Sequence, residues 1–131
     1  MIKVTISDME NTKDVFSVAE LREILSMRYD NDANSFEIVP FGKDVPHLTI
    51  VIKQNMSVLN YFDSSETAGF VSDNPDNKLD PNGFTTLYYQ SPVSGEEYWN
   101  RQIVSASDAM RAAEEFAVTM ALPTAVRWVE L

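Results

Sequence analysis

Hydrophobic and polar residues alternate in several short segments of the chain, which predicts strands of a sheet. The first segment is IKVTIS, at residues 2–7, where apolar and polar side chains take turns as they do along a half-buried strand. SFEIVPF, HLTIVIKQ and SVLNYF follow between residues 35 and 62, and the last two are close enough to pair as a hairpin. AGFVS, FTTLYYQ and EYWNRQIV add three candidates between residues 68 and 104. This series predicts a meander of antiparallel strands with one buried face.

Two segments instead have the period of about 3.6 residues that is typical of amphipathic helices. The first, SVAELREILSMRY, has Ser17 as N-cap and Glu20 three residues later, which is a capping box, and its apolar face extends to Tyr29. The second begins at Ser105 and should stop near Ala121, since a proline follows two residues later. Its predicted buried stripe consists of Ala109, Ala112, Ala113, Phe116, Ala117 and Met120.

The chain ends on AVRWVEL, a hydrophobic segment that alternates again and predicts a closing strand. We expect Phe116 and Met120 to face the sheet, Pro123 to turn the chain, and Trp128 to hold the last strand in the core. The whole pattern predicts one α+β domain over residues 1–131. Its sheet should have about five to seven antiparallel strands packed against two helices, with the C-terminal strand closing the sheet.

Charge adds the first functional information. The 131 residues include 20 Asp and Glu against 10 Lys and Arg, a net charge of −10. Such a surface repels nucleic acid and anionic membranes and attracts basic partners, so we expect neither nucleic acid nor membrane as a partner. The start of the chain lacks the pattern of a secretory signal, and no apolar run approaches the length of a membrane span. These features favour a cytoplasmic protein.

Motifs for catalysis or metal binding are missing from the sequence. There is no Cys, no glycine-rich phosphate loop, and no pair of carboxylates that the pattern singles out. The acidic segment from Asp73 fails as an EF-hand, because Pro75 and Lys78 occupy the third and sixth positions. His47 is the only histidine and lies in no triad or metal motif, so a structural role is expected. We therefore predict no catalytic residue, no metal and no cofactor.

Adjacent aromatic residues in two predicted strands are candidates for binding a partner. Tyr88 precedes Tyr89, and Tyr98 precedes Trp99. Neighbours along a strand point to opposite faces of a sheet, so one residue of each pair should face the core and the other solvent. An outward Tyr or Trp can anchor a partner protein, and the alternative is packing within the sheet.

A strand pair, a capped helix and a closing strand with a tryptophan make up the C-terminal half, and together they resemble the first-numbered family of bacterial immunity proteins. The similarity covers roughly the last 75 residues. It is carried by Ala109, Ala113, Phe116, Pro123 and Trp128, and more loosely by Leu59, Tyr61 and Phe62. In that family the helix usually closes with Gly before the Pro, whereas Met120, Ala121 and Leu122 stand there in this chain.

The resemblance implies a protein that binds and neutralises a cognate secreted toxin of a polymorphic toxin system by occluding it, without catalysis. Deaminase toxins are among the partners of such proteins, and a nuclease is the other candidate here. The segment from residue 63 to residue 80 is strongly acidic, with five Asp or Glu against Lys78 alone. We predict that it faces the toxin. The candidate contact residues are Tyr61, Asp63, Glu66, Phe70, Asp73, Asp76 and Asp80.

Two alternatives stay open from the residues themselves. A non-catalytic regulatory or assembly adaptor would use the same outward aromatic residues as an inhibitor. A small enzyme with an unrecognised acidic site is less favoured, because no nucleophile and base are recognisable together. No feature of the sequence indicates an oligomeric state.

Overall fold

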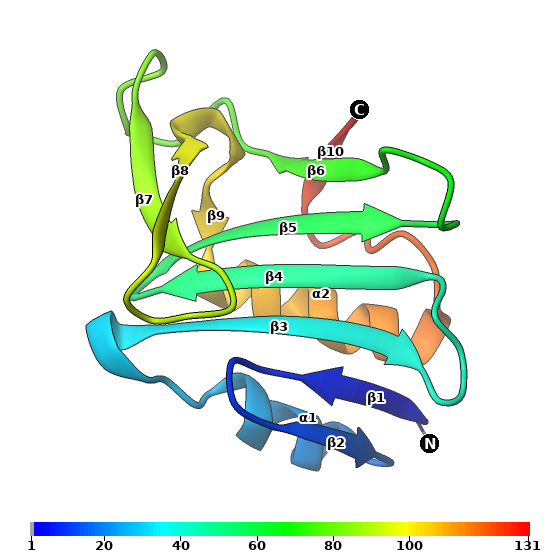
Figure 1. Cartoon of the computed structure of the whole chain (residues 1–131). Coiled ribbons are helices and arrows are strands. Elements are labelled where there is room, and N and C mark those ends of the chain that lie inside the picture. Colours follow the sequence, from blue (N-terminus) through cyan, green and yellow to red (C-terminus); the bar gives the residue numbers. More distant parts are fainter. Residues whose placement is uncertain (1) are drawn as a thin grey trace.

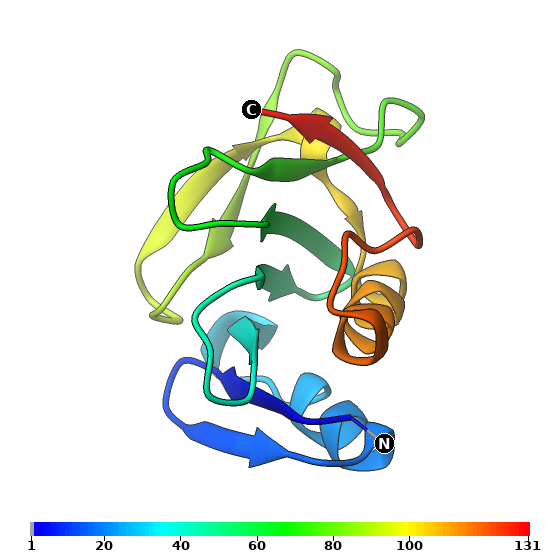
Figure 2. The same ribbon diagram turned by 90° about the vertical axis from the view of Figure 1, so that its right-hand side faces the viewer.

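Both helices lie on one face of an antiparallel sheet, and a two-stranded hairpin lies on the other face (Figures 1 and 2). The computed structural model describes residues 2–131. The main sheet has eight strands in the order β10-β6-β5-β4-β3-β1-β2, with β9 paired to β5. They are β1 (Val4–Ser7), β2 (Thr12–Val15), β3 (Ala33–Pro40), β4 (His47–Lys53), β5 (Met56–Phe62), β6 (Phe70–Asp73), β9 (Val104–Ser105) and β10 (Arg127–Glu130). The α+β class and the closing C-terminal strand are thereby confirmed.

The main core lies between the sheet and the helices α1 (Val18–Leu25) and α2 (Ala106–Thr119). Leu48, Ile50 and Ile52 of β4 point toward the helices and are fully buried, as is Phe116 of α2. Their alternate positions along the strand put these side chains on one face. We call the opposite face, away from α1 and α2, the open face. A second, smaller cluster on the open face consists of Val51, Val58, Val71, Leu87 and Ile103.

The hairpin of β7 (Phe84–Tyr88) and β8 (Gly95–Trp99) forms a sheet of its own, so the prediction that these strands continue the meander is wrong. The segment expected as one strand from residue 97 to residue 104 is also interrupted. A 3₁₀ turn, η2 (Asn100–Gln102), separates β8 from β9. The buried Asn100 explains the break, because its backbone N–H donates to the Gly83 carbonyl at 3.0 Å and its Nδ2 donates to the Asp80 carbonyl at 2.9 Å.

The predicted N-caps of both helices are confirmed, and the ends differ from expectation. Ser17 Oγ accepts a hydrogen bond from the Glu20 N–H at 3.2 Å, and Ser105 Oγ accepts one from the Asp108 N–H at 3.1 Å. Helix α1 ends at Leu25, so Tyr29 is not part of its apolar face. Helix α2 ends at Thr119, because the next residue, Met120, has a left-handed backbone with φ of 54°.

The C-terminal strand β10 starts at Arg127, two residues later than predicted, and pairs antiparallel with β6. The ring of Trp128 lies 6.4 Å from that of Tyr61, measured between centroids, and its Nε1 donates to the carbonyl of the buried Pro123 at 2.7 Å. Trp128 therefore packs on the edge of the main core and ties the strand to the turn before it.

Strand β2 was not predicted, since three of its four residues are polar and exposed. It pairs antiparallel with β1 at the edge of the sheet. Thr5 Oγ1 donates to Asp14 Oδ1 across the pair at 2.8 Å. A polar edge strand has almost no hydrophobic alternation of its own, so only its partner reveals it. The remaining short element is the 3₁₀ turn η1 (Asp30–Asp32) before β3.

Candidate functional site

The predicted acidic segment is divided by β6 into two loops. Asp63 and Glu66 lie in the loop before the strand, whereas Asp76 and Asp80 lie in the loop after it (Figure 1). Asp73 is the last residue of β6 itself. The structure therefore does not bring these carboxylates together as one patch.

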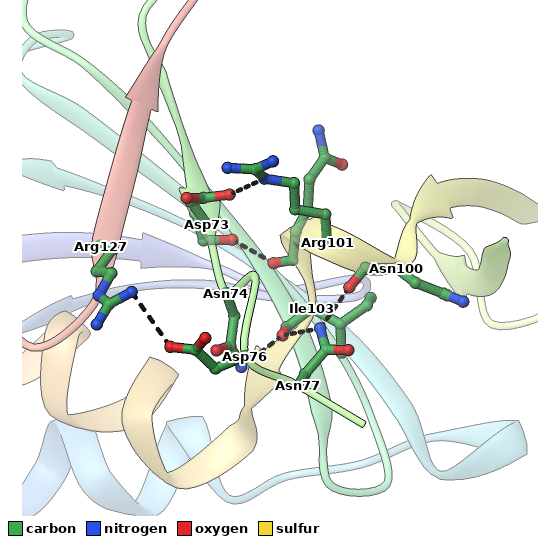
Figure 3. A network of polar contacts seen from close by, with 10 residues as sticks. Asp73, Asn74, Asp76, Asn77, Asn100, Arg101, Ile103 and Arg127 are labelled. Carbon is green, nitrogen blue, oxygen red and sulfur yellow. Dashed lines mark hydrogen bonds and ion pairs between the residues drawn. The ribbon is translucent and has the colours of Figure 1, made fainter. Parts of the chain in front are cut away.

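The second of these loops is held by ion pairs and amide side chains (Figure 3). Asp73 Oδ1 lies 2.7 Å from Arg101 Nε, and Asp76 Oδ2 lies 3.3 Å from Arg127 Nη1. The Asp73 side chain is only 13% exposed. Asn77 Nδ2 donates to the Asn100 carbonyl at 2.6 Å, which fastens the loop to η2. Two of the five predicted acidic residues are thus already matched by cations of the same chain.

The aromatic residues of the predicted site belong mainly to the core. Tyr61 is 6% exposed, and its ring lies 6.1 Å from those of both Phe70 and Phe116. Phe70 is itself partly buried against the same cluster. Of the residues predicted as a structural signature, Phe116 lies in this core, Trp128 packs against it, and Pro123 is buried. Tyr61 consequently has almost no surface to offer a partner.

A groove of about 660 Å³ lies on the open face, between strands β4 and β5 and the β7–β8 hairpin, and sequence reasoning missed it. Its floor is formed by Thr49 and Val51 of β4 with Val58 and Asn60 of β5. The hairpin side and the far end are lined by Tyr89, Glu96, Tyr98, Asp44, His47 and Phe62. One signal was available in the sequence: Thr49 and Asn60 are polar residues, each flanked on both sides by apolar or aromatic residues of its strand.

Two tyrosines at the hairpin donate hydrogen bonds to carboxylates and have raised pKa values. Tyr89 Oη donates to Glu37 of β3, and burial together with this bond raises the pKa of Tyr89 to about 12. Tyr98 Oη donates to Glu96 Oε2 at 3.2 Å, and burial together with the Glu96 charge raises the pKa of Tyr98 as well. Both phenols, which are neutral near pH 7 as tyrosines ordinarily are, act here as hydrogen-bond donors to carboxylates.

His47 lies at the far end of the groove, with its ring 5.6 Å from that of Phe62. Its Nε2 is buried and has no hydrogen-bond partner within residues 2–131. Over the same residues, no group of three or more His, Asp or Glu side chains is placed to hold a metal ion. His47 Nε2 is thus a buried polar atom whose hydrogen-bonding capacity is not used within residues 2–131.

A pair of exposed aromatic residues lies on the outer side of the hairpin. The ring centroids of Phe84 and Trp99 are 4.1 Å apart, and the two residues are 48% and 51% exposed. Tyr98, the neighbour of Trp99, packs instead against the smaller cluster on the open face. The two residues thus point to opposite sides of the strand, as the alternation predicts, and Trp99 is the outward one.

No helix within residues 2–131 has both the length and the apolar character needed to cross a bilayer.

No family model matches the chain, so the resemblance to the numbered family stays a prediction. The chain is 30% identical over 125 residues to a double-stranded DNA deaminase immunity protein of Burkholderia cenocepacia (strain H111). The aligned region covers 95% of this chain and 97% of that relative. Because the similarity extends over nearly the whole of both proteins, the chain belongs to the family of the double-stranded DNA deaminase immunity protein.

Proposed function

We propose that the chain is an immunity protein that binds a cognate toxin, a deaminase acting on double-stranded DNA, and neutralises it by stoichiometric occlusion. The observation that carries this proposal is the 30% identity to a double-stranded DNA deaminase immunity protein along nearly the full length of both chains. The chain itself does no chemistry in this proposal. It acts in the cytoplasm, where an incoming toxin would reach DNA.

The charge of the chain supports the same proposal. An enzyme that binds duplex DNA needs a positive surface for the phosphates, and a protein with a net charge of −10 is attracted to such a surface. Opposite charges raise the association rate and help to select the partner. Specific protein–protein complexes typically bury about 1,600 Å² of accessible surface in total, and we expect the inhibitory complex to bury a similar area.

Within the acidic segment, we propose that Asp63, Glu66 and Asp80 attract the toxin during the encounter. All three are exposed, and none forms an ion pair within residues 2–131. Asp73 and Asp76 contribute less, since Arg101 and Arg127 neutralise them. Phe70 and Tyr61 support the loop from the core side.

The test is co-expression with the toxin domain that the proposal expects to be encoded beside this chain's gene. We expect the chain to restore growth, to co-purify with the domain in equal amounts, and to stop its deamination of duplex DNA in vitro. An unrelated protein of equal net charge serves as control and should not inhibit. Failure to rescue growth and to form a complex would overturn the proposal. A complex that leaves deamination unchanged would favour an adaptor, and turnover of a substrate by the chain alone would favour an enzyme.

A further inference from the structure

The groove on the open face combines aromatic rings with carboxylates. Phe62, Tyr89 and Tyr98 contribute rings, and Asp44 and Glu96 contribute charges. Aromatic faces attract cations through the ring quadrupole, and carboxylates bind guanidinium and ammonium groups by charge-assisted hydrogen bonds. This combination is suited to a cationic side chain.

The carboxylates of the groove differ from those of the loop after β6. Neither Asp44 nor Glu96 forms an ion pair within residues 2–131, and no Lys or Arg lines the groove. Glu37 lies behind Tyr89 and adds a third negative charge on the same side. In contrast, Asp73 already forms an ion pair with Arg101. The groove is thus an anionic site whose carboxylates have no paired cation within the described part of the chain.

The polar groups around the carboxylates are arranged to receive a ligand. Tyr98 Oη donates to Glu96 and holds this carboxylate at the edge of the hairpin. Thr49 and Asn60 face each other across the two strands and offer hydrogen-bonding groups on the floor, beside the apolar pair of Val51 and Val58. The volume of about 660 Å³ is within the range of roughly 300–1,000 Å³ that is typical of ligand pockets. It can accommodate long side chains together with the backbone that carries them.

We propose that this groove binds a basic segment of the toxin, with Asp44 and Glu96 pairing with its arginine or lysine side chains. The inference rests on the proposed function and names the surface by which the chain holds its partner. Charge complementarity selects this occupant, since a DNA-binding protein is rich in exposed cations and the groove has none of its own. The acidic loops then guide the encounter, and the groove retains the bound toxin.

The experiment compares two double variants that each remove two negative charges. Asp44→Asn/Glu96→Gln changes the groove, and Asp30→Asn/Glu97→Gln changes two exposed acids that do not line it. Glu97 is a particularly close control, because it follows Glu96 and points to the other side of β8. Binding to the catalytically inactivated deaminase domain is measured by calorimetry, and thermal melting confirms that both variants are folded.

We expect Kd to rise about tenfold or more for the groove variant, since loss of close charge pairs across an interface has effects of this order, and to rise less than about threefold for the control. A third variant, Asn60→Trp, fills the floor and should weaken binding similarly. If the groove and control variants bound with equal affinity and Asn60→Trp bound like the wild type, the groove would not be the toxin-binding surface, and the proposed function would stay intact. No binding by the wild-type chain would overturn both.

Discussion

The two faces of strands β4 and β5 differ in what their side chains do. Toward the helices, Leu48 and Ile50 are fully buried in the main core. On the open face of the same strand, His47 and Thr49 are only partly buried and line a groove. Because successive residues of a strand alternate between faces, one strand can support the fold with every second residue and leave the others for binding. Substitutions on the two faces should therefore have separable effects on stability and on toxin affinity.

The largest loss of stability is expected when the closing strand is removed. Truncation after Leu122 deletes β10 and with it Trp128, which packs against the main core. Trp128 is only partly buried, so its loss alone costs less than the roughly 3–5 kcal/mol of a fully buried aromatic ring, but the pairing with β6 is lost and the edge of that strand is exposed in addition. We expect the free energy of unfolding, measured in urea, to fall by several kcal/mol. A truncated chain that unfolds at the wild-type urea concentration would refute this role of the strand.

A matched pair of substitutions tests the two faces directly. Phe116→Ala creates a cavity on the helix side, where the ring is fully buried, and should cost roughly 3–5 kcal/mol in urea unfolding. Thr49→Ala on the open face should cost about 0.5 kcal/mol or less, because it removes little buried apolar volume. If Thr49→Ala destabilised the chain as much as Phe116→Ala, the division of roles between the faces would be wrong.

Charge reversal in the acidic loops should act on the association rate. Asp63→Lys/Glu66→Lys/Asp80→Lys is expected to slow toxin association about tenfold at low salt, and the difference should shrink as salt is added. Stopped-flow mixing at several ionic strengths measures this. The control, Glu10→Lys/Glu23→Lys/Asp30→Lys, changes the net charge by the same amount at three exposed positions outside these loops. Identical salt dependence in both variants would show that net charge alone governs the encounter, without a contribution from these loops.

The smallest expected effect is an alkaline loss of stability from the hairpin. Burial and Glu37 raise the pKa of Tyr89 to about 12 in the folded chain, whereas the unfolded value is about 10. Above pH 10 the unfolded chain therefore releases this proton first. The stabilisation is complete below about pH 10 and is lost as the pH rises toward about 12. Because Tyr89 is only partly buried, solvent screening should keep this loss well below the limiting slope of about 1.4 kcal/mol per pH unit. Urea unfolding from pH 9 upward should show a shallower decrease for Tyr89→Phe than for the wild type, and parallel curves would contradict the assignment.

The elements with strong periodicity could be predicted from sequence. The capping residues Ser17 and Ser105 and the alternation in β4 and β5 are local signals, and each predicted its element. Strand β2 could not be predicted, because a polar edge strand is held only by its pairing with β1. The separate hairpin could not be predicted either. Where β7 and β8 leave the meander depends on the buried Asn100, whose hydrogen-bond partners are distant in sequence.

The candidate site was less predictable than the fold. The acidic segment is obvious in sequence, but a charge count cannot reveal that Arg101 and Arg127 lie against Asp73 and Asp76. The groove depends on the hairpin folding over strands that are some thirty to fifty residues earlier in the chain, so its lining residues share no sequence motif. Polar residues flanked by apolar ones, such as Asn60, were the one local indication that the open face differs from the core face.

Hydrogen–deuterium exchange of the chain with and without the inactivated deaminase domain tests the central claim most directly, namely that the open face holds the toxin. We expect new protection in the loops that border the groove, at residues 41–46, 63–69 and 89–96, and no change in the exposed positions of α1. Protection confined to α1 and the outer side of α2, with the groove loops exchanging as in the isolated chain, would contradict the account.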